Sequence, residues 1–268
     1  MPDKPYSSFQ LAVRYLRYYC TSDNGRGHGI HSPFVYDFVR KVLRDKKQQP
    51  AFAAIEALRA RLLRDRTRLP VADWGAGSVD GHAPARRICD IAKRAAKPRR
   101  LAQLLYRSVQ YFQPRSVLEM GSSLGISGAY LAAAAAPQPV TTLEGAPALA
   151  EKAAAHFREL ELNNITVIHG RFFDQLPALL ATTPPDFAYV DGHHTEAATL
   201  EYFHLLKTAA HPGMVMVFDD IHWSPGMESA WNAIRRDPAV TCSIDLFFLG
   251  FVFFNPDIKI PQHFSIRY

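Results

Sequence analysis

The residues with the clearest chemical potential lie in the segment Val117-Leu-Glu-Met-Gly-Ser-Ser-Leu-Gly-Ile-Ser-Gly128. An apolar run at 116–120 predicts a buried strand, and the glycines after it allow a sharp turn that brings the backbone close to a ligand. An alanine-rich helix then runs to about residue 136, and its first N–H groups can bind a polar ligand. A second apolar run, 140–143, ends at Glu144, whose carboxylate suits the hydroxyls of a ribose. This layout predicts a nucleoside-cofactor site.

The details of this turn favour a sulfonium nucleoside over a dinucleotide. Gly121, Gly125 and Gly128 do not follow the G-x-G-x-x-G spacing of dinucleotide sites. Glu119 would repel a pyrophosphate but could pair with an ammonium group, which S-adenosylmethionine carries. The alternative is a plain strand-to-helix turn whose glycines serve packing alone. A second glycine-rich segment, 71–77, lacks an adequate strand before it and an acid-bearing unit after it, so we expect a loop near the site.

Acidic residues end two later predicted strands. Asp191 follows one apolar run, and Asp219 and Asp220 follow the next. The carboxyl ends of neighbouring parallel strands meet at the edge where open α/β sheets bind ligands. Clustered carboxylates repel one another unless a cation or basic group lies among them. These residues are therefore candidate magnesium ligands, and the alternative is that they bind only cofactor and loop amides.

Histidines adjoin these acids. His193 and His194 come directly after the Asp191-Gly pair, and an imidazole with a pKa near 6.5 can accept a hydroxyl proton near neutral pH. The alternative is that this segment only begins a helix, with Thr195 or His194 as its cap. Other residues are weaker candidates for lining or closing the site: His222, Trp223, His28 and His31.

The order and spacing of these motifs resemble class I S-adenosylmethionine-dependent methyltransferases. The segment 117–125 is similar to their first motif. Their O-methyltransferase branch includes metal-dependent catechol-type and macrolide sugar enzymes. Two later segments of this chain resemble that branch, Tyr189-Val-Asp-Gly-His-His-Thr-Glu196 and Pro212-Gly-Met-Val-Met-Val-Phe-Asp-Asp220. The resemblance covers about residues 101–255. It implies methyl transfer from S-adenosylmethionine to an oxygen of a small-molecule acceptor, aided by magnesium if a metal binds.

The resemblance also implies roles for individual residues. Glu119 and Gly121 would hold the methionine end of the cofactor, Glu144 the ribose, and Arg171 and Phe172 the adenine. Many relatives carry an acid where this chain has Arg171. The full set of implied cofactor-binding residues is Glu119, Gly121, Ser122, Ser123, Leu124, Gly125, Glu144, Gly145, Arg171, Phe172 and Asp191.

The implied catalytic residues follow the same two motifs. In the macrolide sugar branch a histidine three residues after the first aspartate is the base, and His194 holds that place relative to Asp191. The implied metal ligands are Asp191, Asp219 and Asp220.

The elements that must position these residues alternate from residue 115 onward. Strand-like runs at 116–120, 140–143, 165–169, 187–190, 214–218, 241–248 and 251–254 are separated by helical patterns. Such alternation predicts a doubly wound α/β fold with a seven-stranded, mostly parallel sheet. A tight join at Leu249-Gly250 predicts a hairpin, so the last strand should run antiparallel. We expect residues 1–100 to be a helical basic N-terminal extension, with a loop at 67–85, and residues 101–268 to form the methyltransferase domain.

The charge distribution leaves alternatives open. Residues 1–115 hold 23 Lys+Arg against 9 Asp+Glu, whereas residues 116–268 hold 8 against 16. A basic part can attract nucleic acid or form a solvated surface, so an RNA methyltransferase remains an alternative. A cofactor-binding protein without turnover is another, and a nucleotide-dependent oxidoreductase is a third. Scattered cysteines argue against a disulfide framework. We expect a cytoplasmic protein with no membrane partner, and a homodimer is compatible with the sequence.

Overall fold

The computed structural model describes residues 3–23, 25, 31–71 and 85–268. The chain divides into two compact units. The central unit is Lys46–Pro185, and the terminal unit combines Met1–Asp45 with Asp186–Tyr268. The predicted boundary at residue 100 stays a prediction. Most of the second glycine-rich segment, 71–77, and His28 lie outside the described residues.

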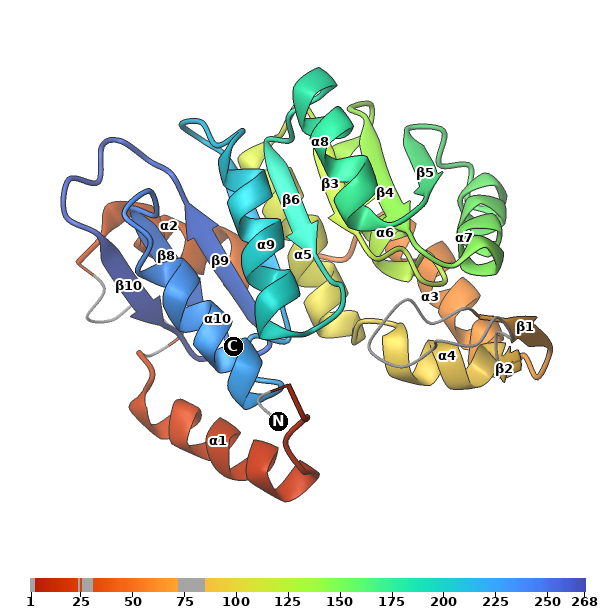
Figure 1. The fold of residues 1–268 in the computed structure, drawn as a ribbon, viewed down its shortest axis with the longest axis horizontal. Helices are drawn as coiled ribbons and strands as arrows, with labels where there is room; N and C mark the ends of the chain where they lie inside the picture. Colours follow the sequence, from red (N-terminus) through yellow and green to blue (C-terminus); the bar gives the residue numbers. More distant parts are fainter. Residues whose placement is uncertain (1–2, 24, 26–30, 72–84) are drawn as a thin grey trace. The chain divides into compact units, whose positions relative to one another are not determined.

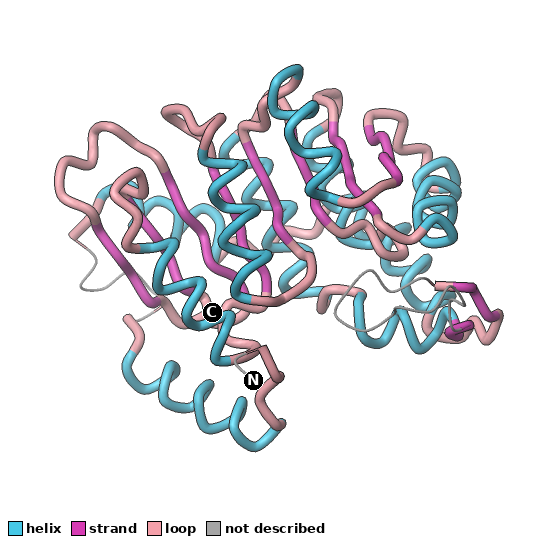
Figure 2. Tube along the Cα trace, viewed as in Figure 1, coloured by secondary structure: helices cyan, strands magenta, loops and turns pink. Residues whose placement is uncertain are grey.

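In the central unit, three labelled strands of the described chain form a parallel sheet in the order β3-β4-β5. The strands are β3 (Val117–Met120), β4 (Val140–Glu144) and β5 (Ile165–His169). The helices are α3 (Pro50–Leu62), α4 (Ile88–Ala95), α5 (Arg99–Phe112), α6 (Ile126–Ala135), α7 (Pro147–Glu159) and α8 (Phe172–Thr182). The alternation of helix and strand along the chain can be followed in Figure 2.

Helices cover both faces of this sheet. Leu118 of β3 lines a depression together with Leu179 of α8. The next residue, Glu119, faces α6, because a Cβ atom placed on Gly128 would lie 2.7 Å from its Oε2 atom. Since successive strand residues point to opposite faces, α8 and α6 cover opposite faces of β3, and α8 is seen in front of the strands in Figure 1. This arrangement confirms the predicted doubly wound α/β class.

The predicted loop at 67–85 is partly wrong. Strands β1 (Arg68–Pro70) and β2 (Ala85–Arg87) form an antiparallel pair in which Arg68 lies opposite Arg87. Only Leu69 of these two strands is buried. Strands of three residues are too short to show the alternation by which a half-buried strand is predicted, so the sequence pattern held no usable signal.

In the terminal unit, the strand order is β10-β8-β9-β7-β6. The β6–β7 and β8–β10 pairs are parallel, whereas β9 is antiparallel to β7 and β8. The antiparallel strand predicted after a hairpin is therefore confirmed. The strands are β6 (Phe187–Val190), β7 (Val215–Asp219), β8 (Cys242–Asp245), β9 (Leu249–Phe253) and β10 (Gln262–Ser265). The helices are α1 (Ser8–Thr21), α2 (Pro33–Phe38) with a π-helical turn at Val39–Leu43, α9 (Glu196–Lys207) and α10 (Pro225–Arg235).

Two details of the prediction are corrected here. Among the described residues, β3 to β10 amount to eight strands where the sequence predicted seven, because β10 has only Phe264 as an apolar residue and was too polar to detect. The hairpin turn also lies earlier than Leu249-Gly250. It centres on Phe247, whose φ is 70°, and Leu246 N donates to Leu249 O at 2.9 Å.

Gly250 is part of β9, and an aromatic ring occupies the space of its missing side chain. A Cβ atom there would lie 2.6 Å from Cζ3 of Trp231, which belongs to α10. The next residue, Phe251, points to the other face, where its ring centroid lies 5.3 Å from that of Phe38 in α2. Helices therefore cover both faces of the terminal unit's sheet as well.

Helix α1 packs on the hairpin turn between β8 and β9. The rings of Tyr15 and Tyr18 contact that of Phe247 at centroid distances of 5.0 Å and 5.3 Å. A capping box begins the helix, in which Ser7 accepts from the Gln10 backbone and the Gln10 side chain accepts from Ser7 N. The first helix of the chain is thus built into the same unit as the last strands.

The cysteines are far apart in the sequence and lie in different environments. Cys20 is exposed, Cys89 and Cys242 are buried, and all three are unpaired. In residues 3–23, 25, 31–71 and 85–268, no helix combines the length and the apolar character needed to cross a bilayer. The predicted cytoplasmic location stays a prediction.

We expect Gly250→Ala to lower the free energy of unfolding by about 1–3 kcal/mol, because the added methyl group collides with the Trp231 ring. Denaturant unfolding of the single variants and of the Gly250→Ala/Trp231→Phe double variant measures this. Trp231→Phe removes the clashing ring atoms, so the cost of Gly250→Ala should fall by at least half in that background. Equal costs in both backgrounds would contradict the packing argument.

Candidate cofactor and catalytic site

The predicted glycine turn connects β3 to α6 in the central unit. Gly121 has a φ of 105° and Gly125 a φ of 82°, both in the left-handed region that favours glycine. The backbone N–H groups of Gly121 and Ser122 donate to Leu143 O at 2.9 Å and 3.1 Å, so the turn is fastened to the end of β4. Helix α6 begins directly after the turn, at Ile126, as the sequence predicted for the alanine-rich helix.

A buried chain of hydrogen-bonded polar groups connects β3 and β4 to the turn. Thr142 Oγ1 donates to Glu119 Oε2 at 2.6 Å, and it lies 2.5 Å from Ser122 Oγ. All three residues are almost fully buried, Glu119 with 0% of its surface exposed. Gly128 leaves room for the Glu119 carboxylate, as noted above. Polar groups at this depth require partners, so the chain ties the acid at the end of β3 to the turn.

Glu144 fastens the turn from the end of β4. Its Oε2 atom accepts from Ser123 N at 2.7 Å, and its Oε1 atom accepts from Ala146 N at 2.9 Å. Burial raises the pKa of Glu144, while the hydrogen bonds from backbone amides act in the opposite direction. The predicted ribose-binding residue is therefore held in one orientation beside the turn.

The remaining predicted cofactor residues of this unit lie around the same turn. Gly170 N donates to Glu144 O at 3.0 Å, which places the end of β5 beside the end of β4. Arg171 is the residue before α8, and Phe172 is its first, buried residue. His169 Nε2 lies 3.1 Å from Gly145 O. Their contacts with the adenine and ribose stay a prediction.

His156 of α7 is a contributor that sequence reasoning missed. Its Nδ1 atom donates to Leu124 O at 2.9 Å, which fixes the carbonyl in the middle of the turn. Burial lowers the pKa of His156, so the ring stays neutral at physiological pH. A helix-face pattern alone could not identify this residue, because its partner lies 32 positions away in the sequence.

The second cluster of candidate residues lies in the terminal unit. Asp191, His194 and Asp219 each offer a ligand atom, and these atoms all lie within 4.8 Å of one another. Asp191 directly follows β6 and Asp219 ends β7. The two strands are parallel, with Val190 opposite Phe218, so their carboxyl ends meet as predicted.

Asp220 differs from its neighbour. Its φ is 51°, its backbone N–H donates to Phe248 O at 2.8 Å, and its carbonyl accepts from Trp223 N at 2.8 Å. Asp220 is not one of the three residues whose ligand atoms converge. Its predicted role as a metal ligand stays a prediction, whereas His194 joins the two converging carboxylates.

Tyrosines contact Asp191 of this cluster and the neighbouring His193. Tyr189 Oη donates to Asp191 Oδ2 at 3.0 Å, and His194 Nε2 lies 3.3 Å from Asp191 Oδ1. Tyr202 Oη lies 2.5 Å from His193 Nδ1. The i, i+2 spacing that puts Tyr189 and Asp191 on one side of a strand is a signal that the sequence did contain.

The loop that carries the two histidines is strained. His193 and His194 have φ values of 60° and 42°, which non-glycine residues adopt at an energetic cost. Thr195 is the cap of α9, because its side chain accepts from Ala198 N. The cap interpretation thus applies to Thr195, and His194 is left to face Asp191.

His222 lies in a separate buried cluster. Its Nε2 atom is 2.8 Å from Asp245 Oδ2 and its Nδ1 atom is 3.2 Å from Glu228 Oε1, and the Phe247 ring stacks on it. Burial opposes protonation, but the two carboxylates outweigh it and raise the pKa of His222 to about 9. Trp223 beside it is partly exposed. The other weak candidate among the described residues, His31, is exposed.

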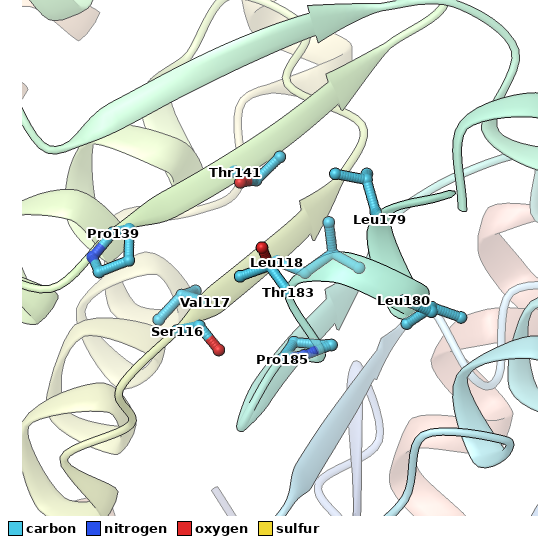
Figure 3. A pocket seen from close by; sticks show the side chains of 9 residues that line it. All are labelled: Ser116, Val117, Leu118, Pro139, Thr141, Leu179, Leu180, Thr183 and Pro185. Carbon is cyan, nitrogen blue, oxygen red and sulfur yellow. The ribbon is translucent and has the colours of Figure 1, made fainter. Parts of the chain in front are cut away.

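A small depression in the central unit is not part of the candidate site. Its walls come from the amino ends of β3 and β4 and from the end of α8, as Figure 3 shows, and its volume is about 20 Å³. That is little more than one water molecule occupies. The glycine turn lies at the opposite, carboxyl ends of the same strands, where open α/β sheets bind ligands.

Residues 118–221 match the family model of a methyltransferase domain, a range that contains the glycine turn, Asp191 and Asp219. Three solved structures are similar to this chain. Cofactor-bound Rv0187 from MTB shares 20% identity over 83% of this chain and 96% of its own, with a TM-score of 0.55. An O-methyltransferase from Bacillus cereus in complex with SAH shares 20% sequence identity with this chain. The match covers 82% of this chain and 97% of that protein, with a TM-score of 0.53.

The third is the O-methyltransferase TomG from Streptomyces achromogenes, involved in tomaymycin synthesis and solved in complex with SAM. It shares 23% identity over 82% of this chain and 95% of its own, with a TM-score of 0.53. At these identities the structures show a shared fold. The domain match confirms the resemblance to methyltransferases that the sequence motifs predicted.

We expect the stabilising effect of His222 to depend on pH. Its pKa is about 9 in the folded protein and about 6.5 when unfolded, so its contribution is complete below pH 6.5 and is lost as the pH rises through 9. The charged groups that face it are Asp245 and Glu228, and Glu228 also contacts Arg14. His222→Gln should therefore cost up to about 3 kcal/mol at pH 6 and clearly less at pH 9.5.

Denaturant unfolding at both pH values measures this effect. His204→Gln, on the exposed face of α9, is the matched control and should change stability little at either pH. A cost of His222→Gln that is the same at pH 6 and pH 9.5 would show that the ring is not charged in the folded protein.

Proposed function

We propose that this chain, whose residues 118–221 match a methyltransferase domain, transfers a methyl group from S-adenosylmethionine to an oxygen of a small-molecule acceptor. The observation that carries the proposal is the turn at 121–125, which lies between the carboxylates of Glu119 and Glu144. Two of the similar structures were solved with SAM or SAH, and both are O-methyltransferases by description. The cofactor, when bound, supplies an electrophilic methyl group on a sulfonium sulfur.

The residues of the central unit fit this cofactor. Left-handed backbone at Gly121 and Gly125 forms a tight turn at the carboxyl end of β3, where open α/β sheets bind ligands. Glu144 is fixed by two amides, and each carboxylate oxygen can accept a further hydrogen bond, as a ribose diol requires. The buried Glu119 places a carboxyl group beside the turn, which suits an ammonium group better than a phosphate.

We propose His194 as the general base for the acceptor hydroxyl. Its imidazole contacts Asp191, and Tyr189 holds the other oxygen of that carboxylate, so Asp191 orients the ring. On methylation of the acceptor oxygen, its hydroxyl proton would pass to His194, while the bound cofactor would supply the methyl group and leave as S-adenosylhomocysteine. Alignment of the reacting atoms and removal of this proton are the main tasks of the protein.

We further propose that Asp191 and Asp219 hold a divalent cation, with Mg²⁺ as the expected ion. Two carboxylates that converge with an imidazole repel each other unless a positive charge lies between them. Oxygen ligands suit Mg²⁺, and a bound ion would lower the pKa of an acceptor hydroxyl. Asp220 stays a predicted additional ligand.

The sequence also predicts other partners as alternatives. The basic composition of residues 1–115 is compatible with a nucleic-acid acceptor, and strongly salt-dependent RNA binding would favour it. The proposal of a small-molecule acceptor rests on the O-methyltransferase descriptions of the similar structures. A homodimer and the identity of the acceptor stay open to experiment, and a screen of hydroxylated compounds with methyl-labelled S-adenosylmethionine addresses the second.

We expect Glu144→Gln to weaken S-adenosylmethionine binding about 10–100-fold, because the amide can no longer serve the two backbone N–H groups and the ribose together. Titration calorimetry measures the affinity, and circular dichroism checks the fold. Glu151→Gln, at an exposed position of α7, is the control. Unchanged affinity in Glu144→Gln would remove the assignment of this residue to the ribose.

We expect chelation with EDTA to abolish methyl transfer and Mg²⁺ to restore it. Asp219→Asn should lose Mg²⁺ binding in calorimetry and retain S-adenosylmethionine binding. His194→Gln should retain Mg²⁺ binding and lose about 10²–10⁴-fold in turnover, as removal of a general base does. Activity that survives chelation would eliminate the metal but not the methyl transfer, and loss of Mg²⁺ binding in His194→Gln would make this residue a ligand and not the base.

A further inference from the structure

The first described residues of the chain contact both loops that carry the candidate catalytic residues. Residues 3–7, which we call the N-terminal strap, precede α1 in the terminal unit. Asp3 Oδ1 accepts a hydrogen bond from Glu196 N at 2.8 Å. Glu196 is the first residue of α9 and lies two positions after His194. The strap is therefore bonded directly to the end of the histidine loop.

This bond supplies a partner for a helix end. The first N–H groups of a helix have no partner within the helix, and Thr195 satisfies only that of Ala198. A carboxylate at this end is favoured both as an acceptor and by the helix dipole. Asp3 thus caps α9 from a position 193 residues away in the sequence.

Tyr6 connects the strap to the second loop. Its backbone N–H donates to Trp223 O at 3.0 Å, and Trp223 N in turn donates to Asp220 O at 2.8 Å. Its hydroxyl donates to Glu228 Oε2 at 2.8 Å, in the first turn of α10. One short segment is therefore bonded to the residues that follow β6 and to those that follow β7.

The strap is held rigidly by α1. Arg14 lies 3.8 Å above the centroid of the Tyr6 ring, its Nη2 donates to Tyr6 Oη at 2.8 Å, and its Nε lies 3.3 Å from Glu228 Oε1. The capping box at Ser7 fixes the start of the helix. Charge-assisted contacts of this kind restrict geometry more than neutral ones do, so the strap can transmit the position of α1 to both loops.

We propose that the N-terminal strap positions the catalytic loops, with Asp3 as a positioning residue for His194; this inference rests on the proposed function. His193 and His194 hold left-handed backbone angles, which persist only where the surrounding structure imposes them. The Asp3–Glu196 bond restrains the chain just beyond these residues. Without it, the loop relaxes, and the imidazole no longer keeps its place beside Asp191.

The test compares Asp3→Ala, Asp3→Asn and Tyr6→Phe with Lys4→Ala, an exposed neighbour in the strap, all in the full chain. Hydrogen exchange of the peptide amides at 191–199 is measured together with kcat and the affinity for S-adenosylmethionine. Asp3→Ala should speed exchange in this segment and lower kcat, each about 10-fold, the size of a lost helix cap. Cofactor affinity should be unchanged, and Asp3→Asn, whose amide oxygen can still accept, should recover most of the loss.

The readouts separate this inference from the proposed function, because exchange at 191–199 is measured without any turnover. Tyr6→Phe should speed exchange at 219–228 by a factor of 3 or more relative to Lys4→Ala, a threshold set by the roughly 1 kcal/mol of a typical hydrogen bond. The proposal is overturned if Asp3→Ala and Lys4→Ala exchange alike at 191–199, or if exchange rises equally throughout the chain. Normal exchange with absent methyl transfer in the wild-type protein would instead count against the proposed function.

Discussion

The left-handed backbone at Gly121 and Gly125 is the constraint on which the candidate cofactor site of the central unit depends. A turn of this shape connects β3 to α6 through backbone angles that glycine adopts without strain. Glu144 then accepts from Ser123 N, and Thr142 joins Glu119 to Ser122. Glu144 stays in place because it accepts from the backbone of the turn, and Glu119 because it accepts from Thr142 of β4, which also contacts Ser122.

The terminal unit brings two carboxylates close together at the ends of β6 and β7. Asp219 is almost fully buried at the end of β7, and Asp191 lies at the end of the adjacent, parallel β6. Two acids so close together need a positive or hydrogen-bonding neighbour, and His194 and Tyr189 are the contacts that the structure provides for Asp191. The closeness of the two carboxylates is electrostatically unfavourable by itself. The same closeness suits the pair to hold a cation or to orient a base.

Sequence patterns predicted the sheet strands well where apolar runs end at clear turn signals. The limits of β5 and β6 agree with prediction to the residue, since each is a run of strand-forming residues between polar segments. Sequence patterns failed to predict the role of a residue where that role depends on a contact with a residue distant in the sequence. Gly250 looked like a turn residue because the local sequence does not show that the Trp231 ring packs against it. Neither His156 nor Asp3 lies in a sequence motif. In the site, residue types at strand ends were predictable, and the groups that hold them were not.

The terminal unit is discontinuous, because Met1–Asp45 packs with Asp186–Tyr268. During synthesis the ribosome makes the first 45 residues long before their partners. Tyr15 and Phe38 can reach Phe247 and Phe251 only after β8 and β9 have been translated. The aromatic faces of α1 and α2 must therefore remain unburied, or be shielded by a chaperone, until the last strands emerge.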